Sequence, residues 1–394
     1  MKICLISKYP PIEGGVSSKN YWVSKALGKM GHKVYVVTNS WEVEDDYREF
    51  FRERDLDFYQ PKNVKVFNTD PLSIPHYIPY SKSYVERISS LAIEVIEKYD
   101  IDLIDSKYLI PYVVAGYFAS HFTEKPQILR HAGSDIRRLI YSPYMNTLLI
   151  KILKSVDTIA TYPFMVDDFK SFGVPDEKLI LLEGYSVDTN EFSPDKSSSL
   201  REYGVDGDVP LLTFVGKPHR SKGIFHFLRA LKRIKSKKYL ALLLIGKRGR
   251  YQKEIIDAVN DYGLNEKVKI LDFVPPWKMP KIFASSTAVI LPEYNFGVDI
   301  HLSLIPREAM ASGTCPVISK DLYNKYSWIG VKDGKEVVVI DPANSMSFSK
   351  KLSKIIDDPR FAEVIGANAR RKSESVENFV KYISRLIEVY ESVL

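Results

Sequence analysis

A cluster of cations lies between a predicted strand and a predicted helix in the second half of the chain. The segment Gly216–Gly223, with the sequence GKPHRSKG, follows the apolar run Leu211–Val215. Its glycines let the backbone approach a ligand closely, and the free N–H groups at the start of a helix attract anions. Lys217 and Lys222 therefore suit a diphosphate, whose charge needs neutralising when it departs as a leaving group. The alternative interpretation is a basic loop exposed to solvent.

A second candidate site lies in residues 292–319, whose pattern predicts a strand end, a loop, a short helix and another strand. Pro306 fits the first turn of that helix, because its missing N–H group would have no partner there. Gly313 fits the position just after the helix, where a left-handed residue is favoured. Glu308 would then lie in the first helical turn, where its carboxylate could bind sugar hydroxyls beside a phosphate held at the helix N-terminus.

Polar residues also follow two predicted strands in the first half of the chain. Gly14 and Gly15 come after the first strand, Lys2–Ser7, and precede a helix. They could form a backbone cradle for a phosphate or a transferred sugar, or an ordinary glycine turn. His131 and Asp135 follow a later strand. A histidine there could position a reacting group or exchange a proton, whereas the aspartate equally suits the N-cap of a helix.

The elements that position these residues alternate between strands and helices. Strands are predicted from short apolar runs at residues 2–7, 33–38, 64–67, 103–105, 127–131, 158–161, 179–182, 211–215, 240–245, 268–271, 288–291, 315–318 and 337–340. Helices are predicted at 18–30, 83–99, 111–121, 143–153, 224–234, 252–262, 277–285 and within 346–394. This alternation predicts parallel sheets in two facing doubly wound Rossmann-like α/β domains with a cleft between them. Ligands of such sheets bind beyond the carboxyl ends of the strands.

A polar, irregular stretch divides the chain. Residues 184–208 are rich in Ser, Asp, Pro and Gly and show no periodicity, which is typical of a linker. We therefore expect a first domain at 1–184, a linker at 185–208, a second domain at 209–372, and a C-terminal helix at 373–394 that could pack back on the first domain.

Composition and charge narrow the class of protein. The chain has 394 residues and a net charge of +7, which is compatible with anionic small molecules or an anionic membrane face and carries no nucleic-acid signature. Cys4 and Cys315 lie in apolar runs, so they predict buried small hydrophobes rather than a disulfide or a metal site. No run reaches the roughly 20 apolar residues of a membrane span, and the first apolar run is too short for a signal peptide. We expect a cytoplasmic protein that could lie peripherally on the inner membrane face.

One segment could mediate such a membrane contact. Residues 136–154 combine four cations with a series of Leu and Ile residues, as in a basic amphipathic helix that docks on a membrane surface. The alternative is that the aliphatic stripe faces the protein core.

Together these motifs resemble the retaining glycosyltransferases of family four, a glycogen-synthase-like group with the GT-B fold. The matching segments occur in the family's order and span residues 1–340. They are the glycine loop Gly14-Gly15-Val16, the run His131–Asp135, the linker Tyr185–Thr189 with Phe192 and Pro194, the pairs Gly216-Lys217 and Lys222-Gly223, and the helix Glu308–Gly313 with Pro316–Ile318. The resemblance implies an acceptor-side first domain and a second domain that binds a nucleotide-sugar donor.

The resemblance also implies roles for matching residues in the second domain. Lys217 and Lys222, beside Gly216, would hold the donor diphosphate. Glu308 would bind the ribose hydroxyls of the nucleotide, and Arg307 beside it is assigned to the same donor site.

Further roles follow for the remaining matches. The backbone of Phe273–Val274 would meet the nucleotide base, and Gly15–Val16 would approach the transferred sugar and the diphosphate. His131 would contact the sugar near its reacting carbon, and Asp135 would lie on the acceptor side. The resemblance implies that no metal is needed.

In one place the chain departs from the family pattern, which pairs two glutamates with seven residues between them. With Glu308 as the second, the first would fall at position 300, which is Ile300. Glu293, Asp299 or His301 could take its place, and Glu293 also begins a match to the family's Glu-x-x-Phe-Gly motif. In the family this acid faces the donor sugar, so we expect this loop to determine which donor the protein accepts.

The resemblance implies transfer of a hexose from a nucleoside diphosphate sugar to a hydroxyl of an acceptor glycan, sugar or lipid-linked sugar, with retention at the anomeric carbon. Three alternatives remain open. A nucleotide-sugar epimerase would share the GT-B architecture. An NAD-dependent oxidoreductase could also use two α/β domains, although the chain lacks the G-x-G-x-x-G loop. A non-catalytic sensor of sugar nucleotides would fit the altered first acid.

Overall fold

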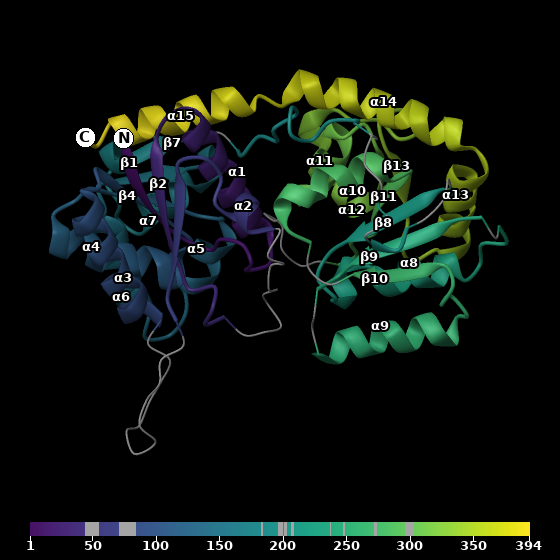
Figure 1. Cartoon of the computed structure of the whole chain (residues 1–394), viewed down its shortest axis with the longest axis horizontal. Coiled ribbons are helices and arrows are strands. Elements are labelled where there is room, and N and C mark those ends of the chain that lie inside the picture. Colours follow the sequence, from purple (N-terminus) through teal and green to yellow (C-terminus); the bar gives the residue numbers. More distant parts are fainter. Residues whose placement is uncertain are drawn as a thin grey trace, which may run out of the picture. The chain divides into compact units, whose positions relative to one another are not determined.

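The computed structural model describes residues 1–43, 55–70, 84–182, 184–195, 200, 203–205, 209–236, 238–246, 249–271, 274–295 and 303–394. These residues form two compact units (Figure 1). The first unit contains the described residues up to Tyr185 together with Val380–Leu394, and the second contains Ser186–Phe379. The chain therefore leaves the first unit within one residue of the predicted start of the linker, and it returns to that unit at its C-terminal end.

In its described residues, the first unit is built on one sheet of seven parallel strands. They are β1 (Lys2–Ile6), β2 (Lys33–Thr38), β3 (Val64–Asn68), β4 (Leu103–Lys107), β5 (Gln127–Arg130), β6 (Thr158–Thr161) and β7 (Leu179–Leu181). Their order across the sheet is β3-β2-β1-β4-β5-β6-β7. The order reverses between β1 and β4, which pair with Ile3 opposite Leu103. An open α/β sheet binds its ligands at such a switch point.

Helices cover both faces of this sheet. They are α1 (Gly15–Lys29), α2 (Leu56–Tyr59), α3 (Tyr84–Tyr99), the π-helical turn η3 (Leu109–Val113), α4 (Val114–Thr123), α5 (Ser134–Leu139), α6 (Asn146–Ser155), α7 (Val166–Ser171) and α15 (Phe379–Glu391). Ile104 of β4 belongs to a buried cluster with α3 and α4. Because side chains alternate along a strand, Asp105 faces the other side, where the Tyr390 hydroxyl of α15 donates to it over 2.5 Å.

The second unit repeats the same plan. Its strands are β8 (Leu211–Val215), β9 (Leu240–Leu244), β10 (Val268–Leu271), β11 (Ala288–Leu291), β12 (Cys315–Ser319) and β13 (Val338–Ile340). They are parallel and follow the order β10-β9-β8-β11-β12-β13, so the switch point lies between β8 and β11. Its helices are α8 (Ile224–Leu231), α9 (Gly249–Asp261), α10 (Met279–Ser285), α11 (Ile305–Ala311), α12 (Lys320–Lys325), α13 (Ser345–Asp357) and α14 (Pro359–Val376).

The two-domain α/β prediction is confirmed, while several predicted element bounds are wrong. α1 begins at Gly15, three residues earlier than predicted, because Gly14 at its N-cap has a φ of 116° that residues with a side chain avoid. α6 begins at Asn146 rather than at 143, since Tyr144 adopts a left-handed φ of 65° and ends a turn. The helix predicted at 373–394 is interrupted: α14 ends at Val376, where Glu377 becomes extended.

Two further predictions concern apolar segments. Cys4 and Cys315 are buried free thiols, as expected from the apolar runs that contain them. None of the helices in the described ranges combines the length and the apolar character that crossing a membrane would require.

Candidate functional site

The switch point of the second unit is formed by the loops that follow β8 and β11. The Tyr294 N–H group donates to the carbonyl oxygen of Ser221 over 2.9 Å, which ties the two loops together. Gly223 has a φ of +75°, and a Cβ atom there would lie 1.8 Å from the carbonyl oxygen of Pro292. Only glycine fits this contact, because any side chain would push the loops apart.

A buried ion pair crosses this switch point. Lys222 follows β8, Glu293 follows β11, and the Lys222 Nζ atom lies 2.6 Å from Glu293 Oε1. The two side chains are 13% and 5% exposed. Burial lowers the pKa of Lys222, and the Glu293 carboxylate opposes that shift. The second oxygen of Glu293, Oε2, is buried without a hydrogen-bond partner. An unpaired buried oxygen costs free energy, so a ligand hydroxyl that donates to Oε2 would stabilise this site.

Helix α11 is held in place by a second buried ion pair. Arg307 is buried and its Nε donates to Glu377 Oε1 over 2.5 Å, while a second donor of the guanidinium meets Oε2. The same Oε2 accepts from the Ser186 hydroxyl and from the Val187 N–H group, each over 2.8 Å. Arg307 is thus engaged within the protein, and its role in donor binding stays a prediction. Glu308, the next residue, is 4% exposed in the first turn of α11.

The other predicted donor residues lie on the same edge of this sheet or outside the described residues. Gly216 and Lys217 directly follow β8, and Lys217 is exposed. The His219 N–H group donates to the carbonyl oxygen of Lys217 over 2.7 Å. Val274 is buried after β10. Phe273, Asp299 and His301 lie outside the described residues.

In the first unit, the N-terminus of α1 opens at the end of β1. Gly15 is exposed, and a Cβ atom there would meet nothing within 4 Å. Val16 follows in the first helical turn. The backbone of this turn can therefore be approached closely, as the cradle interpretation requires. The contact of Gly15–Val16 with a sugar or a diphosphate stays a prediction.

His131 lies at the end of β5 with both ring nitrogens bonded to the protein. The Gly133 N–H group donates to Nδ1 over 3.0 Å, and Nε2 lies 2.9 Å from the Thr161 hydroxyl oxygen. Because Nδ1 accepts, the neutral ring carries its proton on Nε2 and donates to Thr161. Burial lowers the pKa of His131 to about 4. The ring is therefore neutral near pH 7 and fixes the turn between β5 and α5.

Asp135 joins that turn to the end of β4. Its Oδ1 accepts from the Ala132 N–H group and its Oδ2 from the Leu109 N–H group, each over 2.9 Å. The carboxylate is buried, and both of its oxygens are used. Asp135 thus holds the turn after β5 to the residue that follows β4 and Tyr108, and its place on the acceptor side stays a prediction.

The sequence analysis missed two residues at the end of β4. Lys107 is buried, with only 6% of its surface exposed. Tyr108 follows with φ 81° and ψ 120°, and Lys8 Nζ lies 4.3 Å from the centre of its ring. The predicted strand stopped at residue 105, so neither residue was assigned to an element or to a site. Lys107 follows Asp105 and Ser106, so no apolar run marked this part of the strand.

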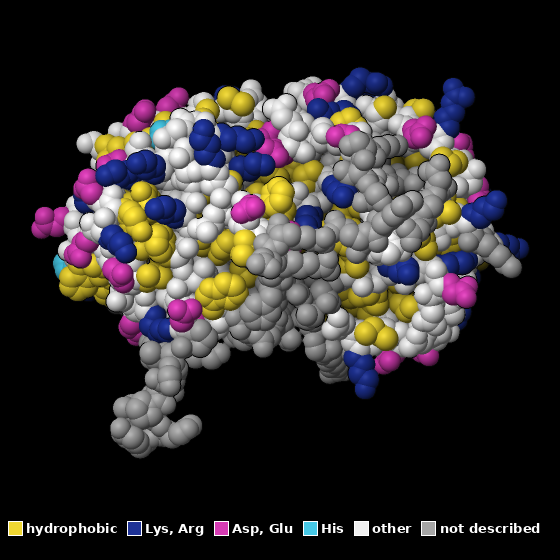
Figure 2. All heavy atoms as spheres, in the orientation of Figure 1, with side chains coloured by type: hydrophobic (Ala, Val, Ile, Leu, Met, Phe, Trp, Pro, Cys, Tyr) yellow, Lys and Arg dark blue, Asp and Glu magenta, His cyan; other side chains and the backbone are white. Residues whose placement is uncertain are grey.

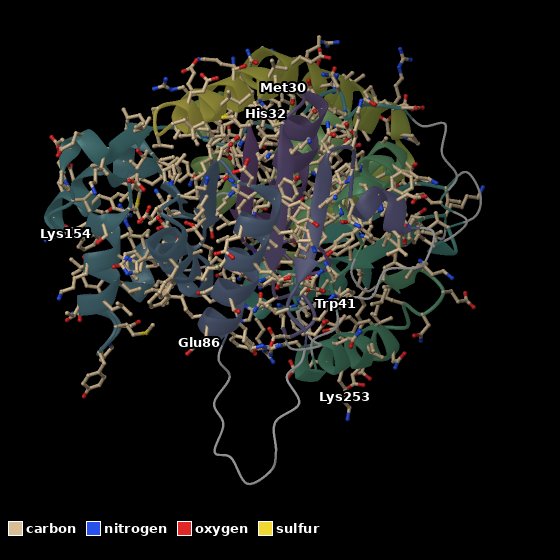
Figure 3. All side chains as sticks on the ribbon, turned by 60° about the vertical axis from the view of Figure 1, so that its left-hand side comes forward. Met30, His32, Trp41, Glu86, Lys154 and Lys253 are labelled. Carbon is tan, nitrogen blue, oxygen red and sulfur yellow. The ribbon has the colours of Figure 1, made fainter. Side chains whose placement is uncertain are left out.

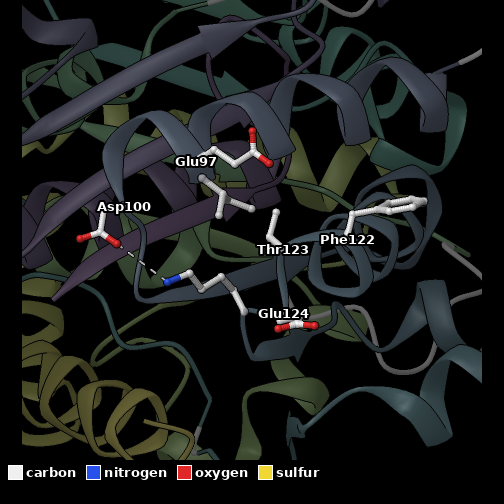
Figure 4. A pocket seen from close by; sticks show the side chains of 7 residues that line it. Glu97, Asp100, Phe122, Thr123 and Glu124 are labelled. Atoms are coloured by element: carbon white, nitrogen blue, oxygen red, sulfur yellow. Dashed lines mark ion pairs between the residues drawn. The ribbon is translucent and has the colours of Figure 1, made fainter.

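A small pocket lies away from these residues, at the amino ends of the strands (Figure 4). It lies between the last turns of α3 and α4, where Lys125 Nζ is 4.0 Å from Asp100. Asp100 also accepts from Lys2, the first residue of β1. This pocket is therefore separate from the ligand-binding edge. Among the described residues, no three His, Cys, Asp or Glu side chains gather as metal ligands.

Comparisons with known proteins agree with this geometry. Residues 14–183 match the family model described as Glycosyltransferase Family 4, and residues 195–372 match the model described as Glycosyl transferases group 1. An uncharacterized glycosyltransferase of Methanocaldococcus jannaschii, MJ1607, is 24% identical over 99% of this chain and 98% of its own. The structure of Anabaena HepE in complex with UDP-glucose superposes with a TM-score of 0.67 at 17% identity, covering both chains fully. Sucrose-phosphate synthase from Thermosynechococcus elongatus gives 0.67 at 17% identity over 99% of this chain and 98% of its own.

Proposed function

Because the chain belongs to glycosyltransferase family four and has the GT-B fold, we propose that it transfers a hexose from a nucleoside diphosphate sugar to an acceptor hydroxyl. The transfer retains the configuration at the anomeric carbon and needs no metal. The observation that carries this proposal is the buried Lys222–Glu293 pair at the switch point of the second unit. It offers a cation for the diphosphate beside a carboxylate oxygen that lacks a partner. HepE, which shares the fold, binds UDP-glucose.

In this proposal the donor exchanges partners with the protein. A phosphate oxygen takes over Lys222 from Glu293, and the released carboxylate accepts hydrogen bonds from the hexose hydroxyls. Lys217 and the N–H groups of the β8 loop add to the stabilisation of the departing diphosphate. Such preorganised charge is usually the largest single contribution to catalysis, because it does not have to reorganise as the bond breaks.

The remaining residues hold the two substrates. Glu308 binds the ribose hydroxyls from the first turn of α11. The open backbone at Gly15 meets the transferred sugar, and the turn that His131 and Asp135 hold rigid lines the acceptor side. The acceptor oxygen then bonds to the anomeric carbon on the face from which the diphosphate departs, the bond from that carbon to the diphosphate oxygen breaks, and the hydroxyl proton passes to the departing diphosphate.

A donor screen followed by turnover of variants tests this proposal. Melting temperatures with UDP, GDP and ADP sugars identify the donor, because a ligand that binds the folded state stabilises it by mass action. Lys222→Ala and Glu308→Ala should then each lower release of the nucleoside diphosphate at least about a hundredfold. Lys125→Ala, at the opposite edge of the first sheet, serves as the control. Wild-type turnover in both site variants would contradict the assignment.

The same assay separates the alternative enzymes. A transferase consumes its donor only with an acceptor, whereas an epimerase interconverts the donor alone. An oxidoreductase would bind NAD, which the same melting experiment measures. Turnover that is lost with EDTA and restored by a divalent metal would contradict the metal-independent mechanism.

Peripheral contact with the inner membrane face also belongs to the proposal, since a lipid-linked acceptor would require it. Within 136–154, most aliphatic residues lie in a buried core cluster. The connection before α6 and the first turn of that helix are different: Tyr141 is 68% exposed and Tyr144 fully exposed in the connection, and Leu148 in α6 is 49% exposed. Arg138 and Lys151 flank them and are exposed. Figure 3 labels Lys154 at the end of this helix. Aromatic and aliphatic side chains beside cations suit an anionic membrane surface.

The overall charge adds little to such a contact. Figure 2 shows cationic and anionic side chains interspersed over the face that it presents. A net charge of +7 spread in this way gives no large field of one sign on that face. Docking would therefore depend on the local segment 138–151.

A further inference from the structure

We propose that Lys107 binds an anionic group of the acceptor, a phosphate or a carboxylate, at the switch point between β1 and β4 of the first unit. This inference rests on the proposed function, and it adds the chemical class of the acceptor. Four sets of observations carry it: the burial of Lys107, the occupation of the nearby carboxylates, the unpaired polar atoms on α1, and the backbone of Tyr108.

Lys107 is a buried cation that has no ion-pair partner among the residues the structure describes. It is 6% exposed, and lysine is almost never so deeply buried unless it is paired. Within the described residues, its Nζ makes no hydrogen bond and no ion pair. Burial lowers the pKa of Lys107 well below its ordinary value, and the charges of Arg130 and Lys19 lower it further. An anion beside Nζ would relieve both effects.

The two carboxylates near Lys107 are already occupied. Asp105 accepts from Arg130 Nε over 2.7 Å and from the Tyr390 hydroxyl over 2.5 Å. Asp135 uses both of its oxygens on backbone N–H groups, as described above. Both carboxylates act to raise the pKa of Lys107, but burial and the neighbouring cations lower it by more. The protein therefore supplies cations at this edge without a carboxylate dedicated to Lys107.

Polar side chains of α1 are linked through Ser7 to the backbone of Lys107. The Ser7 hydroxyl donates to the carbonyl oxygen of Lys107 over 2.9 Å, and Asn20 Nδ2 donates to that Ser7 oxygen over 2.7 Å. Ser17, three residues before Asn20, lies on the same side of the helix. The Ser17 hydroxyl and Asn20 Oδ1 are buried without hydrogen-bond partners. A buried polar surface with unpaired atoms is stabilised when a polar ligand binds to it.

Tyr108, which follows Lys107, carries a phenol O–H group that can donate to an anion, and its backbone conformation is constrained. Tyr108 has a φ of 81°, which residues with a side chain rarely adopt and which proteins keep mainly at functional sites. Its N–H group donates to the Arg130 carbonyl oxygen over 3.1 Å, so the conformation is held by β5. Burial, and then the charge of Asp135, raise the pKa of Tyr108, so the phenol stays protonated and can donate to an anion. Lys8, over its ring, adds a positive charge.

The position in the sheet points to the acceptor rather than to the donor. Lys107 ends β4 beside β1, the switch point where an open α/β sheet binds a ligand. The proposed diphosphate site has its own cation, Lys222, in the second unit. An anion at Lys107 is therefore assigned to the second substrate, which the first unit binds.

Binding of small anions to the full chain tests the inference. Inorganic phosphate and succinate are titrated against the Lys222→Met variant, in which the proposed donor site has lost its buried cation, and against Lys107→Met/Lys222→Met. We expect the single variant to bind one of the anions and the double variant to bind it at least about tenfold more weakly. Preference for phosphate identifies a phosphorylated acceptor, and preference for succinate identifies a carboxylated one. Lys125→Met/Lys222→Met, altered at the opposite edge, should bind like the single variant.

Two outcomes would overturn the inference: no binding of either anion to the Lys222→Met variant, or equal affinity in the Lys107→Met/Lys222→Met variant. A lysine with a purely structural role would change the melting temperature and leave the anion affinity unchanged. If Lys107→Met does not fold, Tyr108→Phe in the Lys222→Met background replaces it and should weaken anion binding severalfold. Nucleoside diphosphate binding to Lys107→Met reports separately on the proposed function, because it depends on the second unit.

Discussion

Replacing Glu293 by Gln should weaken the fold and at the same time tighten the binding of a nucleoside diphosphate. The change removes the negative charge 2.6 Å from Lys222 and preserves the size of the side chain. Removing one partner of a buried ion pair typically costs about 3–5 kcal/mol. Because Lys222 keeps some exposure and burial already lowers its pKa, we expect a cost at or just below the lower end of this range, about 2–3 kcal/mol.

The compensation appears when the ligand binds. In the wild type, a diphosphate has to compete with the Glu293 carboxylate for Lys222, whereas in Glu293→Gln that carboxylate no longer competes. We expect the dissociation constant of the nucleoside diphosphate to fall about tenfold, which corresponds to about 1.4 kcal/mol. Turnover should fall nonetheless, because the hexose loses its carboxylate partner.

Calorimetric titration and thermal unfolding measure the two effects on the same protein. Glu254→Gln is the matched control. Glu254 of α9 pairs with Arg220, which lies in the same loop as Lys222, but this arginine is 71% exposed. Exposed pairs contribute about 0–1 kcal/mol, so this control should change neither stability nor affinity by much. Weaker nucleotide binding in Glu293→Gln, or a loss of stability no larger than in the control, would refute the reasoning.

Three further predictions follow from individual contacts. His131 is neutral when folded and has a pKa of about 4, against 6.5 ordinarily, so the unfolded state binds the extra proton between those values and stability falls as the pH drops through that window. The loss is on the order of 3 kcal/mol, and His131→Asn should abolish this slope in denaturant titrations from pH 7 to pH 4; an unchanged slope would disprove the assignment. Gly223→Ala should cost more than Gly263→Ala by at least about 2 kcal/mol in chemical unfolding, because both have positive φ but only Gly223 approaches a backbone oxygen. Equal costs would exclude that contact as a constraint. Tyr144→Ser should reduce co-sedimentation with anionic vesicles severalfold, and added salt should reduce the wild-type binding, whereas Phe122→Ser, 67% exposed at the other edge, should have no effect. Wild-type binding that is absent at low salt would contradict the membrane contact.

The fold could be predicted because parallel strands buried on both faces are continuous apolar runs. Ala288–Leu291 was predicted with the bounds that the structure gives to β11. The caps of α11 were also readable, since Pro306 lies in its first turn and Gly313 has a φ of +67° after its end. These features depend on residues within one turn of one another, so local sequence determines them.

The site could be predicted only in part, because its decisive contacts join residues far apart in sequence. Lys222 and Glu293 are 71 positions apart, and their contact follows from the pairing of β8 with β11. Similarly, Glu377 anchors Arg307 across 70 positions. A local pattern assigns such residues to a motif but cannot say which partner they meet. This explains why Arg307, predicted as a donor ligand, is engaged within the protein.

The lysines at the two switch points differ in whether they have an ion-pair partner, and this difference bears on which ligands each unit can bind. Lys222 is paired with Glu293, so its charge is balanced when no donor is bound. A ligand therefore binds well only if it carries more negative charge near Lys222 than the Glu293 carboxylate does. A diphosphate with two negative groups meets that requirement, and a single carboxylate does not. Lys107 has no such counter-ion within the described residues, so a singly charged group is sufficient to balance it. The two proposals therefore assign a substrate with one anionic group to the first unit and a substrate with a diphosphate to the second.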